Sequence, residues 1–66
     1  MIVKVNGESV TCKESDTMAD LIAALQLEGK VMAAAVNMNI VKQDSWNEHQ
    51  LNDNDVVELL DFVGGG

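Results

Sequence analysis

Three consecutive glycines, Gly64, Gly65 and Gly66, follow an apolar segment. A segment of this composition is suited to entering the active site of another protein. Without side chains the glycines can pass through a narrow channel and adopt backbone conformations closed to other residues. Fully extended, they span about 10 Å, at 3.3 to 3.6 Å per residue. An ordinary frayed chain end is the alternative, but it does not explain three glycines directly after an apolar strand. The pattern favours a segment that reaches into a partner.

Cys12 is the only cysteine and could in principle relay sulfur or act in redox chemistry. It shares one face of an expected strand with Val10, and no histidine stands near it in the sequence. Free cysteine is among the most buried residue types. We therefore predict that Cys12 packs in the core.

The remaining polar candidates point away from a metal site. His49 is the only histidine and lies in a polar segment, so a site there lacks visible second and third ligands. Asp53, Asp55 and Glu58 have neither the spacing nor the glycine of a 12-residue calcium-binding loop. We interpret His49 as a surface residue, and the acidic residues as a turn and a solvated face.

Length and charge limit the possible functions. A chain of 66 residues forms one domain and buries only about 60% of the surface that its unfolded form exposes, which argues against a self-contained enzyme. Four lysines against eleven acidic residues give a net charge of −7, which argues against nucleic acid and anionic membranes and favours basic protein partners. One cysteine and the absence of a signal peptide or bilayer-spanning run predict a soluble, cytoplasmic protein.

The first half of the chain predicts a hairpin followed by a helix. Residues 1–5 and 8–13 alternate as strands, and Asn6-Gly7 supplies the two positive-φ positions of a tight turn. Apolar residues at helical spacing predict a helix from Met18 to Leu27 or Glu28. Thr17 and Asp20 can form a capping box at its start, and Gly29 suits the left-handed position after its end.

The second half predicts three further strands. The apolar run 31–36 is too short for a normal helix, and a turn at 37–39 leads to a short strand at residues 40 and 41. A polar crossover at 42–55 is anchored by Trp46 and Leu51 and ends in a turn at 53–55. A final strand runs from Val56 to about Val63.

This order of elements predicts an α+β fold of the β-grasp, or ubiquitin-like, type. A single helix can cover only one face of a mixed sheet of four to five strands, and the connection lengths favour a last strand inserted centrally. We expect a β-grasp domain over residues 1–63 and a flexible glycine tail over 64–66.

The last strand has two faces of different character. Val57 and Leu59 share one face, while the opposite face carries Val56, Glu58, Leu60 and Phe62. Glu58 marks that second face as solvated, so Leu60 and Phe62 either form a partner site or pack under the crossover. The sequence leaves these alternatives open.

Short motifs along the whole chain recur in one family. They are Val5-Asn6-Gly7-Glu8, Thr17 with Leu21 and Leu25, Val36-Asn37, Ile40-Val41, Trp46, Leu51, Asp53, Asp55, Val57-Glu58 and Val63-Gly64-Gly65-Gly66. With these motifs the sequence resembles the ThiS sulfur carriers of thiamine thiazole biosynthesis, relatives of ubiquitin and of the small molybdopterin synthase subunit. It departs from the family pattern at Val41-Lys42-Gln43, where proline and arginine are common, and at Asn54, where glycine is common.

The resemblance implies a reaction at the chain end. A ThiF-like adenylating enzyme would use MgATP to convert the Gly66 carboxylate into an acyl-adenylate, and a persulfide donor such as a cysteine desulfurase system would displace AMP. The resulting thiocarboxylate would supply sulfur to a ThiG-like thiazole synthase. The family's free diglycine carboxylate maps onto Gly65 and Gly66. From the face of the last strand and the tail that follows it, we expect partner contacts at Leu60, Phe62, Val63, Gly64 and Gly65.

The same resemblance implies that the chain is a cosubstrate rather than an enzyme, and a monomer when free. It binds no cofactor of its own, and its sequence has no glycine-rich phosphate loop with lysine. Two rival functions remain. A small molybdopterin synthase subunit would use the same thiocarboxylate, and a ubiquitin-like modifier would join Gly66 to a lysine of another protein. The short length, Asn6-Gly7-Glu8 and Trp46 favour thiamine.

Overall fold

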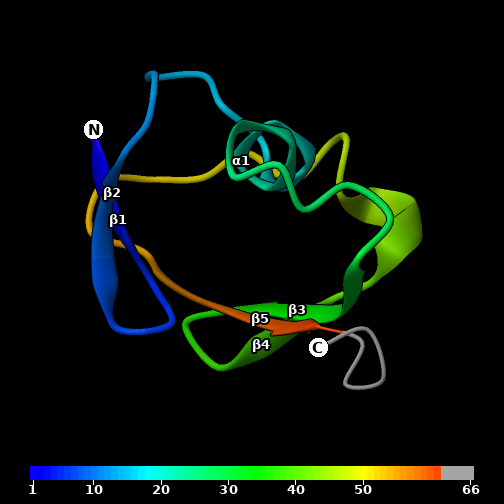
Figure 1. Cartoon of the computed structure of the whole chain (residues 1–66). Helices are drawn as coiled ribbons and strands as arrows, with labels where there is room; N and C mark the ends of the chain where they lie inside the picture. The colour runs from blue at the N-terminus through cyan, green and yellow to red at the C-terminus, as the bar shows by residue number, and fades with distance from the viewer. Residues whose placement is uncertain (62–66) are drawn as a thin grey trace.

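The computed structural model describes residues 1–61, which form one mixed sheet and one α-helix. The strands are β1 (Ile2–Val5), β2 (Glu8–Thr11), β3 (Val31–Val36), β4 (Asn39–Val41) and β5 (Val56–Asp61). Their order in the sheet is β2-β1-β5-β3-β4, with β5 parallel to β1 and antiparallel to β3. The predicted β-grasp architecture is confirmed, because the last strand is central and α1 (Met18–Ala24) lies over one face (Figure 1).

Both hairpins turn through residues with positive φ. Asn6 and Gly7 have φ values of 50° and 90° and join β1 to β2, as the sequence predicted. Asn37 and Met38, with φ values of 50° and 71°, join β3 to β4. Asparagine tolerates the left-handed conformation better than most residues, which explains why it begins both turns.

The helix begins as predicted but ends earlier. Asp20 N donates to Thr17 Oγ1 at 3.2 Å and Thr17 N donates to Asp20 Oδ2 at 2.9 Å, so the capping box is present. The predicted end near Glu28 is wrong, and Gly29 adopts the predicted left-handed conformation, with φ 76°, but does not directly follow the helix. Gln26 takes the left-handed position with φ 61°, and Leu27 N donates back to Ile22 O at 3.0 Å. This early stop brings Leu27 against the core.

Within residues 1–61, no helix has both the length and the apolarity needed to cross a bilayer.

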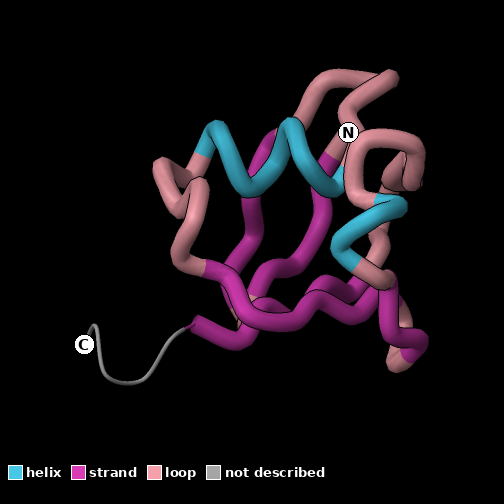
Figure 2. The backbone as a smooth tube through the Cα atoms, turned by 90° about the vertical axis from the view of Figure 1, so that its right-hand side faces the viewer, coloured by secondary structure: helices cyan, strands magenta, loops and turns pink. Residues whose placement is uncertain are grey.

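The core lies between α1 and the inner face of the sheet. Its members are Val3, Val5, Cys12, Met18, Leu21, Ile22, Val31, Ala34, Val36, Val41, Trp46, Leu51, Val57 and Leu59. The crossover closes the same side, and Figure 2 shows α1 and the short 3₁₀ helix Gln43–Ser45 together above the strands. Trp46 and Leu51 anchor it as predicted, and Trp46 Nε1 donates to Val41 O at 2.8 Å.

Asp55 ends the predicted turn before β5, but its side chain is buried, which the sequence did not predict. Its side chain is only 7% exposed, whereas Asp53 and Glu58 are exposed. Asp55 Oδ1 accepts from Asn37 Nδ2 at 3.0 Å, and Oδ2 accepts from the backbone N of Asn52 at 2.8 Å. These bonds compensate for the loss of water around the carboxylate. They also tie the turn before β5 to the turn between β3 and β4.

We expect Asp55→Ala to lower the free energy of unfolding by about 2 kcal/mol, because it removes two hydrogen bonds made by a buried carboxylate and unties the turn before β5 from the turn at Asn37. The control is Asp44→Ala, since Asp44 is exposed and makes no cap bond. Urea unfolding followed by circular dichroism measures both variants. Equal unfolding midpoints for the two variants would show that the Asp55 network contributes nothing.

Candidate functional site

The structure places one of the predicted site residues. Leu60 lies on β5 and its side chain is 55% exposed on the sheet face opposite α1. Phe62, Val63, Gly64, Gly65 and Gly66 lie outside the described residues. The candidate site within residues 1–61 is therefore the part of the sheet surface around Leu60.

Three neighbouring strands build this surface. The register pairs Ala33 with Leu60, Ala35 with Glu58, and Ala35 with Ile40 on the other side. Because alternate residues of a strand share a face, these side chains stand on the face that α1 does not cover. We call the group Ala33, Ala35, Ile40, Val56 and Leu60, with Glu58 among them, the outer patch.

The outer patch is open and apolar. Ile40 is 73% exposed, and the small side chains of Ala33 and Ala35 leave a shallow hollow of about 290 Å³ between Ile40 and Leu60. The alternative prediction, that Leu60 packs under the crossover, is wrong, because the crossover lies on the helix side of the sheet (Figure 2). Contiguous exposed apolar surface of this kind suits contact with another protein.

Glu58 gives the outer patch a negative charge. It lies on β5 between Val56 and Leu60 and is exposed. Within residues 1–61 the only ion pair joins the Met1 amine to Glu14 at 3.8 Å, so the Glu58 carboxylate has no cationic partner in that part of the chain. A lysine or arginine on a docked protein could therefore meet it beside the apolar contacts.

Sequence reasoning missed four members of the outer patch. The pattern gives no face for Ala33, Ala35 or Ile40, and it places Val56 on the solvated face without a role in partner contact. The register supplies what was missing, because Ile40 lies across β3 from Ala35 and Val56 lies beside Lys4. The alternation of Ile40 with the buried Val41 was a signal for its exposure.

Cys12 is buried, as predicted, and is held by the hairpin. Its backbone N donates to Met1 O at 2.7 Å, and its carbonyl accepts from the Met1 amine at 2.9 Å. Burial raises the pKa of the Cys12 thiol above its usual value, and the negative charge of Asp16 raises it further. The thiol is therefore protonated at neutral pH, whereas the nucleophile in sulfur chemistry is the thiolate.

The other polar candidates are dispersed rather than gathered. His49 is half-buried and its backbone carbonyl accepts from Met18 N at 2.9 Å. Asp53 Oδ1 accepts from Ile2 N at 2.7 Å, Asp55 is buried, and Glu58 stands on the outer patch. In the described part of the chain, no three histidine, cysteine, aspartate or glutamate side chains are grouped to hold a metal ion.

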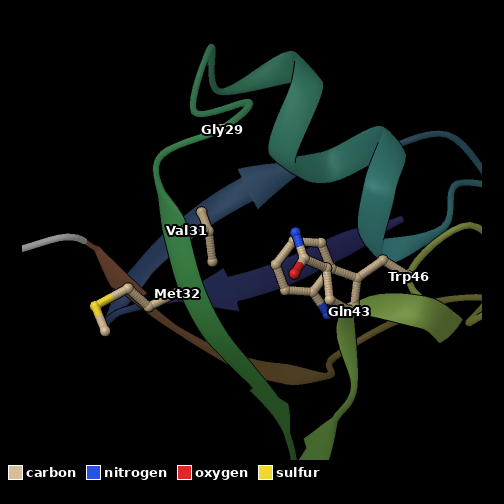
Figure 3. Close-up of a pocket in the computed structure, with 5 residues that line it drawn as sticks. All are labelled: Gly29, Val31, Met32, Gln43 and Trp46. Carbon is tan, nitrogen blue, oxygen red and sulfur yellow. The ribbon is translucent and has the colours of Figure 1, made fainter.

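A second hollow opens between β3 and the crossover (Figure 3). It has a volume of about 230 Å³ and is lined by Gly29, Val31, Met32, Gln43 and Trp46. Figure 3 shows Met32 pointing away from Trp46. The polar side chains among the five are the Gln43 amide and the Trp46 indole, and the others are apolar or glycine. None of these five residues can transfer a proton near neutral pH, which leaves the hollow without catalytic groups.

The fold and its exposed sheet face define a small β-grasp protein. The crystal structure of the thiamine biosynthesis protein ThiS from Geobacter metallireducens superposes with a TM-score of 0.81, at 30% identity and with full coverage of both chains. Residues 3–66 match the model of the ThiS family, and the chain belongs to that family.

Relatives agree with this assignment. The sulfur carrier protein ThiS of Bacillus subtilis strain 168 is 38% identical over 66 residues, covering 98% of this chain and 100% of the relative. ThiS of Escherichia coli strain K12 is 27% identical over 66 residues, covering all of both chains. A thiazole synthase of Paramagnetospirillum magneticum is 32% identical over 66 residues, which is all of this chain and 20% of that protein.

We expect the Cys12 thiol to react with iodoacetamide at least about tenfold more slowly in the folded protein than in the urea-unfolded chain, because it is buried and protonated. Mass spectrometry of samples taken over time measures both rates at one pH. The unfolded chain controls for the intrinsic reactivity of the thiol. Equal rates would show an accessible thiolate and reopen a role for Cys12 in sulfur chemistry.

Proposed function

We propose that this chain is the sulfur carrier protein of thiamine thiazole biosynthesis and that Gly66 bears the sulfur. A ThiF-like enzyme uses MgATP to join the Gly66 carboxylate to AMP, with release of pyrophosphate. Sulfur then replaces one carboxylate oxygen, and a ThiG-like thiazole synthase takes the thiocarboxylate as its sulfur source. The chain acts as a cosubstrate and its partners supply the catalytic groups.

Activation is required because a carboxylate is a poor electrophile. Its charge is spread over both oxygens, and direct substitution would expel oxide. In the acyl-adenylate the leaving group is AMP. The terminal sulfur of a cysteine persulfide attacks the acyl carbon, AMP departs, and an acyl disulfide forms. A second thiol then attacks the donor cysteine's sulfur, forming a disulfide with it, so that two electrons pass to the departing sulfur and the Gly66 thiocarboxylate is released.

The observation that carries this proposal is the position of the outer patch on β5. Leu60 stands near the end of the described chain, on the strand that leads in sequence to Gly64, Gly65 and Gly66. A partner that binds the outer patch would therefore hold the domain close to the reactive end. Docking of this kind lowers the entropic barrier to reaction, because the carboxylate no longer searches freely for the active site.

The thiazole synthase relative supports the choice of partner. In Paramagnetospirillum magneticum, a stretch similar to this whole chain occupies 20% of a protein named thiazole synthase. Joining a carrier domain and a synthase domain in one polypeptide would raise the effective concentration of each for the other. This favours thiazole synthesis over the molybdopterin and protein-modifier alternatives for this chain.

Charge supports a basic docking surface on each partner. The net charge of −7 on 66 residues includes Glu58 within the outer patch. Opposite charge on a partner would accelerate encounter and orient the two proteins, with an effect that weakens as salt rises. The apolar residues around Glu58 would then provide the contact that persists at physiological salt.

We expect the protein to gain the mass of one oxygen-to-sulfur exchange at Gly66 when incubated with a ThiF-like enzyme, MgATP and a persulfide donor. Intact-mass spectrometry with fragmentation locates the change. Cys12→Ala is the matched control and should gain the same mass, because the buried thiol takes no part. A covalent bond from Gly66 to lysines of other proteins, without sulfur exchange, would instead assign the chain to the modifiers.

We expect Leu60→Ala to weaken binding to the adenylating enzyme by about tenfold, because truncating an apolar anchor at an interface commonly costs more than 1 kcal/mol. The unfolding temperature should change little, since Leu60 is 55% exposed. Isothermal calorimetry and a melting curve measure the two effects.

Ile2→Ala provides the control for the Leu60 experiment. Ile2 is 50% exposed on β1 and lies outside the outer patch, so its truncation should leave the affinity unchanged. Loss of affinity in Ile2→Ala but not in Leu60→Ala would move the docking surface to the β1 side of the sheet.

A further inference from the structure

Asn6 makes an unusual pair of contacts with the backbone of β5. Its side-chain Oδ1 accepts from Leu59 N at 2.9 Å, and its Nδ2 donates to Leu59 O at 3.2 Å. The two residues are 53 positions apart in the sequence. One side-chain amide thus satisfies both the donor and the acceptor of a single residue in the central strand.

The Asn6 side chain bonds to β5 at the position where the backbone of β1 no longer pairs with it. Asn6 N donates to Val57 O at 2.9 Å, which is the last β1 backbone bond before the chain turns at Gly7. In a parallel ladder the next β1 peptide group would bond to Leu59. The chain has already turned away, with Asn6 at φ 50°, and the side-chain amide acts as that peptide group. The ladder therefore extends one step further along β5 than β1 itself reaches.

Asn37 makes a similar contact at the other end of β5. Val56 N donates to Asn37 Oδ1 at 2.9 Å, and Asn37 N donates to Val56 O at 2.7 Å. Like Asn6, Asn37 begins a hairpin turn with φ 50°. The two asparagines therefore bond β5 at its first residue, Val56, and at Leu59, which is followed in the strand by Leu60 and Asp61. Of the two contacts, the one made by Asn6 lies nearer in sequence to Gly66.

We propose that Asn6 is a positioning residue for the reaction at Gly66: its amide holds β5 in place at Leu59, on the strand that leads in sequence to Gly66. The inference rests on the proposed function. Leu59 is directly followed by Leu60 of the outer patch, so the amide clamp steadies the strand next to the docking surface. If the clamp is lost, the domain still docks, but the segment that carries Gly66 starts from a less constrained strand and reaches the reactive geometry less often.

Two glycine variants separate positioning from stability. Asn6→Gly and Asn37→Gly each retain a residue that accepts positive φ, so both turns can form. Each loses side-chain bonds to one end of β5, and Asn37→Gly also loses the bond to the buried Asp55. Asn37→Gly should therefore destabilise the fold at least as much as Asn6→Gly. It is the matched control, because it loses its bonds at the start of β5, farther in sequence from Gly66.

The first measurement is amide hydrogen exchange, which requires no partner. Asn6→Gly should speed exchange of the Leu59 amide at least about tenfold, and Asn37→Gly should act on the Val56 amide instead, because each variant frees one named N–H. Unchanged Leu59 exchange in Asn6→Gly would overturn the clamp itself.

The second measurement is pyrophosphate release by the ThiF-like enzyme with MgATP, at a temperature where circular dichroism shows both variants folded. Asn6→Gly should lower kcat about tenfold and leave KM for the carrier within about twofold, because docking is retained while positioning is lost. Asn37→Gly should match the wild type in both constants.

The outcomes distinguish the two hypotheses. If the wild type is adenylated and Asn6→Gly equals it, or if both variants lose kcat equally, Asn6 has only a structural role and this inference is wrong. If the wild type releases no pyrophosphate with its enzyme, the proposed function fails and the inference fails with it.

Discussion

The central position of β5 is the constraint on which the rest of the structure depends. β5 pairs with β1 on one edge and with β3 on the other, and the side chains of Asn37 and Asn6 add bonds at Val56 and Leu59. With its backbone groups engaged on both sides, β5 offers a partner little opportunity to add a strand beside it. A partner that meets β5 would therefore contact the side chains that stand on the sheet.

Alternation along β5 divides two tasks between neighbouring residues. Val57 and Leu59 point inward and are buried, so they hold the strand against the helix. Glu58 and Leu60 point outward and are exposed, so they can contact a partner. Because successive side chains of a strand point to opposite faces, stability and recognition can change independently in adjacent positions. A chain this small can carry both functions on one strand.

The polar and nucleophilic side chains of residues 1–61 are dispersed, and those residues hold no group of three histidine, cysteine, aspartate or glutamate side chains that could bind a metal ion. The two hollows described above are shallow, and their walls are mainly apolar. The single thiol, Cys12, is buried and protonated. A thiol in this state is a poor nucleophile and reacts slowly in thiol–disulfide exchange.

The sequence by itself determined the features that depend on neighbouring residues. The Asn6-Gly7 turn, the capping box of Thr17 and Asp20, and the alternation of Val57 and Leu59 with Glu58 and Leu60 were all predictable, because each rests on contacts or geometry within a few positions. Together with the family motifs they were sufficient for the β-grasp fold and for the family.

Only the tertiary structure decided the features that join distant segments. Asp55 is buried because Asn37, 18 positions away, supplies a donor for its carboxylate. Ile40 joins the outer patch because β3 and β5 place Leu60 nearby, and Asn6 clamps Leu59 across 53 positions. Side-chain amides and carboxylates favour turns by local rules, but their distant partners are set by the order and register of the strands.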